Sequence, residues 1–478
     1  MGNLQLKRIS CDHPDALEGL RRLRKQLSSH ADVISEKGRQ LTEAVFGEPL
    51  SPVRVVERVC KDVQQNGLEA LLRYSEHFDK RKLDATTFRV SAEELQRAHE
   101  SVTPDYLAVL RRVSQNILSF QSGLLSSDAV LHAPDKHELK MRFRPMRRIG
   151  ICVPGGAAAY PSTLLMTVCP ARAAGVKEIV VVLPPTEFGG YNTDLLAACH
   201  ELGVREVYRV GGAQAVAAMA YGVEGMEPVD MIVGPGNIFV TLAKKYVFGE
   251  VDIDCLAGPS EVVVIADETV PASFVAADLI AQAEHDPGTS ILITWHEPLL
   301  DEVIAELEQQ LDSLERSDAT RRCLEEFGAM VLVKDRNEAA RITDQIGPEH
   351  LHIECRDAAA LSDQIDNAGA IFLGPYTPVA LGDYAAGPSH VLPTGGTVRF
   401  ASGLSAPDFV RRTSVIQFTP RGLAELSHDV QYLANKEGLT GHRDSVEIRL
   451  RTAARQASEM QVARNGAADP RVISTDEG

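Results

Sequence analysis

The sequence predicts an α/β protein with two parallel-sheet halves, because short apolar runs alternate with helical stretches over most of its length. From residue 148 these runs end in glycine or proline, as in "RRIGICVPGG", "VKEIVVVLPP" and "VDMIVGPGN". After residue 260 the same pattern resumes with "SEVVVIAD", "SILITW", "AMVLVKD", "HLHIE" and "AIFLG". Continuous apolar runs are typical of strands buried on both faces, and strand–helix alternation builds parallel sheets.

The segments on either side of this region are predicted to be helical. Apolar residues recur at helical spacing between residues 10 and 120, as in "SPVRVVERVCKDVQQNGLEALLRYSEHF". After about residue 400 the strand pattern fades into "GLAELSHDVQYLANKEG" and "LTGHRDSVEIRLRTAARQA". We therefore expect these parts: an N-terminal helical arm (1–40), a first, discontinuous α/β domain (41–150 and 261–400), a second, Rossmann-like domain (151–260), a C-terminal segment (401–457) and a flexible tail (458–478).

Composition excludes several classes of protein. The chain has 478 residues and a formal net charge of −17, which disfavours binding to a nucleic-acid backbone. Its eight cysteines form no CxxC pair, which argues against a disulfide scaffold and fits a reducing cytoplasm. The N-terminus has no signal-peptide core. The uncharged run 149–171 contains three prolines, so we expect no membrane span.

Three glycine-rich loops follow predicted strands and are candidates for binding a nucleotide. They are 154–156 (PGG), 211–214 (GGAQ) and 234–237 (GPGN). Glycines at the carboxyl ends of parallel strands let the backbone approach a ligand, and the next helix offers free N–H groups to a phosphate. Neither GxGxxG nor GxxxxGK[ST] occurs, so both standard fingerprints are absent. A single loop is better explained as a tight turn, but three in succession, two of them with an amide side chain (Gln214 and Asn237), favour a ligand.

Polar residues in apolar surroundings are candidate metal ligands. Gln282 and His285 are spaced to share one face of a helix that we expect to end at Asp286–Pro287. For His285 alone, a favourable charge at the end of a helix is the simpler explanation. Asp383 stands in an apolar stretch, and His442 follows in "EGLTGH". These nitrogen and oxygen donors suit Zn²⁺ or a similar ion, although spacing alone does not bring them together.

Taken as a set, the motifs resemble the histidinol dehydrogenase family over roughly residues 20–455. The matching pieces occur in family order: "VPGG", "GGAQA", "VGPGNIFVTLAKK", "AGPSEVVVIAD", "AQAEHDP", "IGPEHL", "FLGPYTP", "GDYAAGPSHVLPTGG" and "EGLTGHRDSV". The resemblance implies an NAD-dependent homodimer with one Zn²⁺ per subunit. The family reaction oxidises L-histidinol to L-histidine in two hydride transfers through a bound aldehyde, as the last step of histidine biosynthesis.

The resemblance also implies roles for particular residues. The zinc ligands would be Gln282, His285, Asp383 and His442. The substrate contacts would be these four together with Ser260, His350, His390 and Glu437. The cofactor contacts would be Cys152, Gln214 and Asn237. The C-terminal segment would mediate dimerisation and bring Glu437 and His442 to the partner's site. The chain departs from the family at Cys152, where a tyrosine is usual, and at Cys255-Leu256, where Met-Pro is usual.

Glu349 and His350 stand side by side after a Gly-Pro turn in "QIGPEHLHIE". Imidazole suits repeated proton transfer near neutral pH, and a carboxylate can orient and deprotonate water. Because adjacent side chains diverge on most backbones, we assign His350 as the main acid–base and Glu349 as the activator of water. Two alternatives stay open: a related zinc/NAD dehydrogenase of another small polar alcohol, such as a sulfonated diol, and a catalytically silent metal-binding scaffold.

Overall fold

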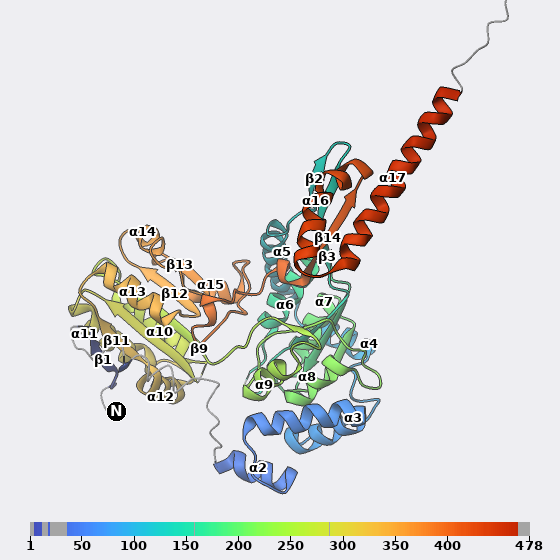
Figure 1. The fold of residues 1–478 in the computed structure, drawn as a ribbon. Helices are drawn as coiled ribbons and strands as arrows, with labels where there is room; N and C mark the ends of the chain where they lie inside the picture. The colour runs from blue at the N-terminus through green and yellow to red at the C-terminus, as the bar shows by residue number, and fades with distance from the viewer. Residues whose placement is uncertain (1–3, 12–17, 20–35, 157, 286, 467–478) are drawn as a thin grey trace, which may run out of the picture. The chain divides into compact units, whose positions relative to one another are not determined.

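A computed structural model describes the chain apart from residues 1–3, 12–17, 20–35, 157, 286 and 467–478 (Figure 1). The chain divides into two compact units. We call Met1–Leu125 with Pro145–Val410 the main unit, and Ser126–Arg144 with Arg411–Gly478 the C-terminal unit. The predicted α/β class with parallel sheets is confirmed.

The first sheet of the main unit has six strands in the order β1-β11-β10-β9-β12-β13, all paired in parallel. Its strands are β1 (Lys7–Ser10), β9 (Ser260–Ala266), β10 (Gly288–Thr294), β11 (Ala329–Leu332), β12 (His350–Glu354) and β13 (Ala370–Leu373). One apolar core joins this sheet to α10 (Ala272–Ala283), α11 (Pro298–Leu311) and α12 (Ser317–Phe327). A second core joins its other face to α13 (Arg336–Ile346) and α14 (Ala358–Ser362). Both faces are therefore covered, as the apolar strands predict.

The second sheet has five parallel strands in the order β6-β5-β4-β7-β8. They are β4 (Arg148–Cys152), β5 (Glu178–Leu183), β6 (Glu206–Arg209), β7 (Met231–Val233) and β8 (Asp252–Ile253). One face packs on α4 (Ala92–Ser101), α5 (Pro104–Gly123), α6 (Pro161–Ala173) and α7 (Thr193–Glu201). The other packs on α3 (Pro52–Asp79), α8 (Gly212–Tyr221) and α9 (Ile238–Val247).

Two segments were expected in the wrong part of the fold. Residues 41–150 were expected to join 261–400, but α3, α4 and α5 cover the five-stranded sheet. Helical periodicity reveals that a face is buried, and it does not reveal which sheet buries it. The expected helical arm 1–40 contains β1, which extends the six-stranded sheet by pairing with β11. The helix α2 (Glu36–Phe46) begins within that arm, and residues 12–17 and 20–35 lie outside the described residues.

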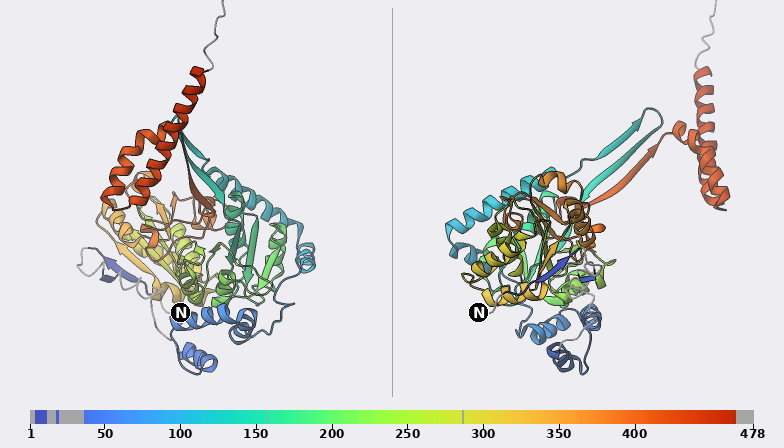
Figure 2. Two further views of the ribbon diagram at one scale, coloured as in Figure 1. Left: turned by 45° about the vertical axis from the view of Figure 1, so that its right-hand side comes forward. Right: turned by 90° about the vertical axis from the view of Figure 1, so that its left-hand side faces the viewer.

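The C-terminal unit contains a small sheet that the sequence did not predict. Strands β2 (Ala129–Ala133) and β3 (His137–Pro145) pair antiparallel, and β14 (Val410–Phe418) lies on the other side of β3. Figure 2 shows these strands side by side, followed by α16 (Pro420–Lys436) and α17 (Thr440–Gly466). Because α17 continues to Gly466, the first part of the expected flexible tail is helical. The remainder of that tail lies outside the described residues.

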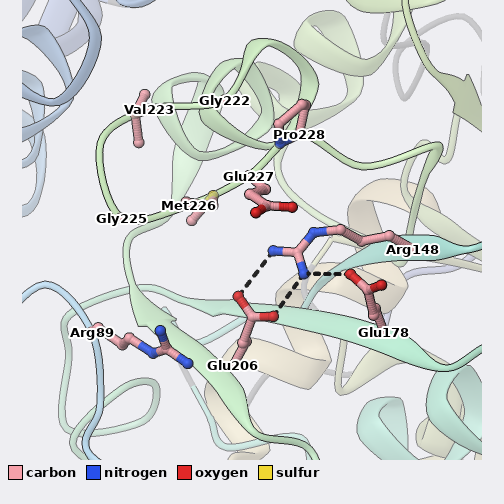
Figure 3. Close-up of a pocket in the computed structure, with 10 residues that line it drawn as sticks. All are labelled: Arg89, Arg148, Glu178, Glu206, Gly222, Val223, Gly225, Met226, Glu227 and Pro228. Carbon is pink, nitrogen blue, oxygen red and sulfur yellow. Dashed lines mark hydrogen bonds and ion pairs between the residues drawn. The ribbon is translucent and has the colours of Figure 1, made fainter.

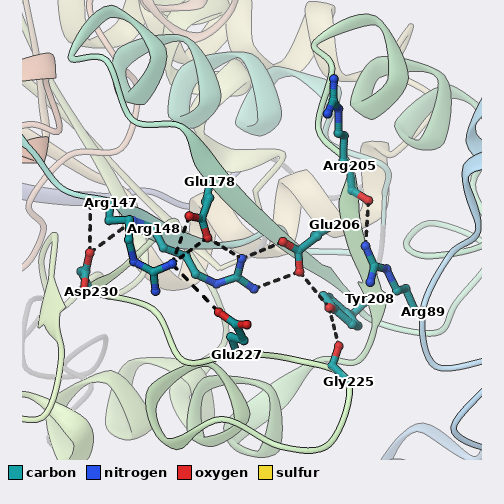
Figure 4. Close-up of polar contacts among 10 residues, drawn as sticks. All are labelled: Arg89, Arg147, Arg148, Glu178, Arg205, Glu206, Tyr208, Gly225, Glu227 and Asp230. Carbon is teal, nitrogen blue, oxygen red and sulfur yellow. Dashed lines mark hydrogen bonds and ion pairs between the residues drawn. The ribbon is translucent and has the colours of Figure 1, made fainter.

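Charged side chains gather at the amino-terminal ends of the five-stranded sheet. Arg148 opens β4, and its guanidinium donates to Glu206 at 2.6 and 2.9 Å and to Glu178 at 3.2 Å (Figure 4). Beside this network lies an open cavity of about 760 Å³, lined also by Arg89 and Glu227 (Figure 3). These bonds pair both terminal nitrogens of the buried Arg148 and link three strand starts. The cavity lies at the edge opposite the glycine-rich loops, so we assign the network to the stability of the sheet.

Candidate active site

The glycine-rich loops after β4 and β7 lie where the strand order of the five-stranded sheet reverses. From β4 the chain proceeds to β5 and β6 on one side, and β7 and β8 lie on the other. Ligands of open α/β sheets bind at such a switch point, outside the carboxyl ends of the strands. Gly234 has φ +99°, and a Cβ there would lie 2.2 Å from the Cys152 carbonyl oxygen. Only glycine therefore allows the two loops to approach this closely.

The expected cofactor residues all lie at this carboxyl edge of the five-stranded sheet, and each is either buried or hydrogen-bonded within the protein. Cys152 ends β4 and is 5% exposed, and burial raises the pKa of its thiol to about 12, which keeps it neutral. The Gln214 amide is buried in α8 and donates to Asp79 Oδ2 at 3.4 Å. The Asn237 side chain caps α9 by accepting from Phe239 N at 3.0 Å.

A buried ion pair beneath the β7 loop was missed by the sequence analysis. Lys244 Nζ pairs with Asp254 Oδ1, and both side chains are only 2% exposed. Lys244 also donates to the Gly234 carbonyl at 3.1 Å, while Asp254 accepts from Gly234 N at 2.7 Å. The only sequence signal was a lysine on the apolar face of the helix in "TLAKK". The pair holds the backbone of Gly234 from both sides.

Glu349 is fixed where β12 begins, next to the start of β9. Its Oε2 accepts from Ser260 Oγ at 2.5 Å and from Glu261 N at 2.9 Å. Burial raises the pKa of the Glu349 carboxyl, although His350 and these two donors act in the opposite direction. The turn before it depends on Gly347, which ends α13 with φ +56°. The carboxyl is thus held in place by two hydrogen bonds, with a pKa above its usual range.

His350 is buried between two carboxylates. Its Nδ1 lies 3.3 Å from the Glu261 carbonyl oxygen and 3.6 Å from Glu349 Oε2, and its Nε2 lies 3.6 Å from Asp383 Oδ1. Burial by itself lowers the pKa of an imidazole, but Glu349 and Asp383 outweigh it and raise the pKa of His350 to about 9. The expectation that Glu349 and His350 diverge is wrong, because their charged groups converge.

Asp383 and His390 form the opposite side of this group. Asp383 lies in α15 (Val379–Tyr384), and its carbonyl oxygen accepts from His390 Nδ1 at 2.9 Å. Burial tends to raise the pKa of Asp383, but the bond to His350 lowers it, so the carboxylate is charged. The other ring nitrogen of His390 lies 3.4 Å from Thr163 Oγ1, and burial lowers the pKa of this imidazole. Thr163 was not among the expected residues.

Three of the expected metal ligands, Gln282, His285 and Asp383, lie in the main unit. Gln282 is 3% exposed in α10, and its Nε2 has no hydrogen-bond partner among the described residues. His285 is exposed just after α10, which ends at Ala283, earlier than expected, and Asp286 lies outside the described residues. His285 acts electrostatically on Glu349, Asp383 and His390. The amide oxygen of Gln282, the charged carboxylate of Asp383 and the exposed imidazole of His285 are oxygen and nitrogen donors of the kinds that fit a zinc ion.

The remaining expected residues lie in the C-terminal unit. Glu437 follows the end of α16, and His442 lies in the first turn of α17. Both side chains are exposed. No partner residue for either one is apparent within this unit, among the residues the structure describes. Their role in the candidate site therefore stays a prediction.

Comparison with known proteins decides the family. A family model described as histidinol dehydrogenase matches residues 50–450. The chain belongs to the histidinol dehydrogenase family. A histidinol dehydrogenase of Rhodopirellula baltica is 57% identical over 435 residues, covering 91% of this chain and 95% of that protein. Another, from Heliobacterium mobile, is 45% identical and covers 83% of this chain and 93% of its own length. The family resemblance inferred from the motifs is confirmed.

A solved structure agrees with this assignment. The crystal structure of histidinol dehydrogenase from Elizabethkingia anophelis superposes with a TM-score of 0.84 at 30% identity, covering 95% of this chain and all of that one. The chain is accordingly an oxidoreductase of this family. Among the residues that the structure describes, no helix is long and apolar enough to span a membrane.

Proposed function

We propose that this protein oxidises L-histidinol to L-histidine with NAD as hydride acceptor and zinc as a bound metal, as the last step of histidine biosynthesis. The reaction would proceed by two hydride transfers through a bound aldehyde, L-histidinal. The observation that supports it best is the convergence of Glu349, His350 and Asp383 beside His285. A carboxylate–imidazole pair with raised pKa values suits a reaction that moves several protons.

His350 is the residue we assign to proton transfer in both half-reactions. Its Nδ1 faces the Glu261 carbonyl oxygen, which can only accept a hydrogen bond, so Nδ1 carries a proton. Its Nε2 is then the nitrogen that exchanges a proton with the substrate hydroxyl, and later with the hydrate of the aldehyde. Asp383 stabilises the imidazolium from 3.6 Å.

Glu349 is the residue we assign to water in the second half-reaction. The described hydrogen bonds to its carboxylate, from Ser260 and Glu261, are both to Oε2. Oε1 is therefore the oxygen we assign to orienting and deprotonating a water that adds to the aldehyde. Anchoring one oxygen by two donors limits rotation of the carboxylate and so aims the other.

The metal ligands proposed are Gln282, His285 and Asp383 of one chain with His442 of a second copy. Zinc bound there supplies a positively charged template for the imidazole and amino nitrogens of histidinol. Ser260, His390 and Glu437 are the remaining substrate contacts in this proposal. Cys152, Gln214 and Asn237 would contact NAD at the switch point, although their present hydrogen bonds are structural.

A homodimer with a shared site is part of the proposal. The C-terminal unit exposes large apolar side chains, including Ile416 (70%), Leu433 (60%) and Ile448 (61%). Exposed apolar surface of this extent is typical of an interface between proteins. A second copy of the chain would cover it and receive Glu437 and His442. The cytoplasm is the proposed location, supported by the eight scattered cysteines, which form no CxxC pair.

The direct test is a substrate panel followed by NADH formation in purified protein, with and without added zinc. Rapid NADH formation from L-histidinol, yielding about two NADH per L-histidine, is the expected result. If a sulfonated diol were turned over and histidinol were not, the related dehydrogenase would be the better assignment. If no alcohol in the panel reduced NAD while metal still bound, the protein would be a silent metal-binding scaffold.

A further inference from the structure

A second group of polar side chains is buried beneath the candidate site. His350, His352 and Glu354 alternate along β12 and so share one face of the strand. Asp278 lies one helical turn before Gln282 on α10. Asp278, His352 and Glu354 are 7%, 1% and 0% exposed. One ligand atom from each lies within 4.8 Å of the others.

The hydrogen bonds of His352 define which ring nitrogen faces the carboxylates. Its Nε2 lies 2.9 Å from the Gly374 carbonyl oxygen, which can only accept, so Nε2 carries a proton. Nδ1 hydrogen-bonds the Asp278 carboxylate, which also only accepts, so Nδ1 carries a proton here too, and a metal would replace that proton on Nδ1. That atom contacts Asp278 Oδ2 and lies 3.3 Å from Glu354 Oε1. A histidine that donates to a backbone carbonyl through one nitrogen is the usual form of a metal-binding histidine.

Glu354 supplies an independent observation. Neither of its carboxylate oxygens has a hydrogen-bond partner among the described residues, although the side chain is completely buried. Its strand neighbour on β9 is Ala266, and the core on this face of the sheet is apolar. Burying a carboxylate without hydrogen bonds costs several kcal/mol (on the order of 3 or more), and burial raises the pKa of Glu354 to about 7. A bound cation would offset this cost.

We propose that Asp278, His352 and Glu354 form a second, buried metal site that takes a divalent transition-metal cation such as Zn²⁺. Two carboxylates and a neutral imidazole balance the charge of such a cation. Asp278 Oδ2, His352 Nδ1 and the two oxygens of Glu354 supply four donor atoms without sulfur. Asp278 moves back from Nδ1 so that both atoms face the ion. The site shares no residue with the proposed ligands Gln282, His285, Asp383 and His442.

A metal ion at this site would hold two secondary-structure elements together. The ion joins α10, which carries Gln282, to β12, which carries His350. Residues two apart on a strand are separated by roughly 7 Å, so the buried ion braces the proton-transfer residue from directly below. Asp278, His352 and Glu354 are thus positioning residues, since none of them contacts a reacting atom. The metal site itself does not rest on the proposed function, whereas the bracing of His350 as the proton-transfer residue does.

Metal content tests the inference on the full-length protein. Zinc-loaded, desalted wild-type protein is compared with Glu354→Gln by mass spectrometry of metal per chain. Glu354→Gln keeps the shape of the side chain and is expected to hold one zinc fewer per chain. Asp267→Asn replaces another buried carboxylate, which has protein hydrogen-bond partners, and is expected to hold as much zinc as the wild type. Equal zinc in Glu354→Gln and wild type would overturn the site.

Two further measurements cover a variant that does not fold. Crystals of the wild type grown with Zn²⁺ are expected to show an anomalous scattering peak between Asp278 and His352, and the lack of a peak there would overturn the inference. In an Asp383→Asn background, which removes a ligand of the other proposed site, zinc is expected to raise the melting temperature. Adding Glu354→Gln to that background is expected to abolish the rise. Failure of the histidinol assay would leave these results unchanged, so the two proposals fail separately.

Discussion

His350 Nε2 lies 3.6 Å from Asp383 Oδ1, so the expected acid–base residue contacts one of the expected metal ligands. The contact joins the start of β12 to α15, two elements far apart in the sequence. It raises the pKa of the imidazole and lowers that of the carboxyl. Proton transfer and metal binding are therefore expected to depend on one another in this protein.

Replacing His350 with glutamine is expected to lower kcat by about 10²–10⁴-fold, which is typical of losing a general acid–base. KM for histidinol is expected to change much less, because glutamine keeps a polar side chain of similar reach. Initial rates of NADH formation measure both quantities. His132→Gln, at a histidine that is 61% exposed, serves as the control. A loss confined to KM would contradict proton transfer by His350.

Glu349→Gln is expected to impair oxidation of the aldehyde more than oxidation of the alcohol. The amide oxygen can still accept from Ser260 and Glu261, but it cannot deprotonate water. Single-turnover NADH formation started from histidinol or from histidinal separates the two half-reactions. Equal losses in both would remove the division of labour between Glu349 and His350.

A shared site predicts complementation between inactive subunits. A His350→Gln chain and a His442→Ala chain are each expected to be inactive as homodimers. In mixed dimers, one of the two sites combines the intact His350 of one chain with the intact His442 of the other. Partial recovery of activity, up to about half per mixed dimer on symmetry grounds, is expected. Verified mixed dimers without recovery would argue that each chain completes its own site.

Asp79→Asn is expected to stabilise the protein at neutral and higher pH. Burial raises the pKa of Asp79 from 3.8 to about 6, with the Gln214 amide acting in the opposite direction. Because the pKa of Asp79 is higher in the folded state than in the unfolded state, protonation of its carboxyl stabilises the fold. This contribution to the free energy of unfolding is complete below pH 3.8 and is lost as the pH rises through 6. In urea at pH 8, the free energy of unfolding of the variant is expected to exceed that of the wild type by on the order of 2 kcal/mol.

The same comparison at pH 4.5 is expected to show a smaller advantage for Asp79→Asn, since Asp79 is then mostly protonated in the folded state. A difference in unfolding free energy that did not change with pH would exclude ionisation of Asp79 as its cause. Glu302→Gln, at an exposed carboxylate on α11, provides a comparison that lacks burial.

Lys244→Met is expected to destabilise the protein by about 3–5 kcal/mol, because it leaves the buried Asp254 carboxylate without its cation. The double variant Lys244→Met with Asp254→Asn is expected to recover part of this loss, since no charge is then buried. Chemical unfolding of the two variants gives the comparison. A double variant less stable than Lys244→Met would contradict charge burial as the cause.

The sequence was most informative where local chemistry decides structure. Apolar runs that end in glycine-rich loops predicted the parallel sheets and their carboxyl edges. Gly234 is an example, because only glycine allows the backbone of its loop to lie so close to that of Cys152. Long-range packing was not predictable in this way. Nothing in the amphipathic pattern of α3 indicates which sheet it covers, and the hairpin of β2 and β3 depends on pairing with β14, distant in the sequence.

The same distinction holds for the candidate site, where residues in family motifs were predicted and buried pairs from distant segments were not. Glu349, His350 and Asp383 were found through their family motifs, and the structure brings them together. Buried pairs whose members are far apart escaped notice, because each member alone resembles an ordinary strand or helix residue. His352 is the clearest case, since its partner Asp278 comes from a helix much earlier in the chain.

The short strand β1 closes the edge of the six-stranded sheet at β11 and carries two exposed cations, Lys7 and Arg8. Shortened versions of the protein that begin after Ser10 would leave the backbone N–H and C=O groups of β11 open to another polypeptide. Recombinant forms trimmed at the amino terminus would consequently be prone to self-association and poor recovery, even though no residue of the candidate site had been removed.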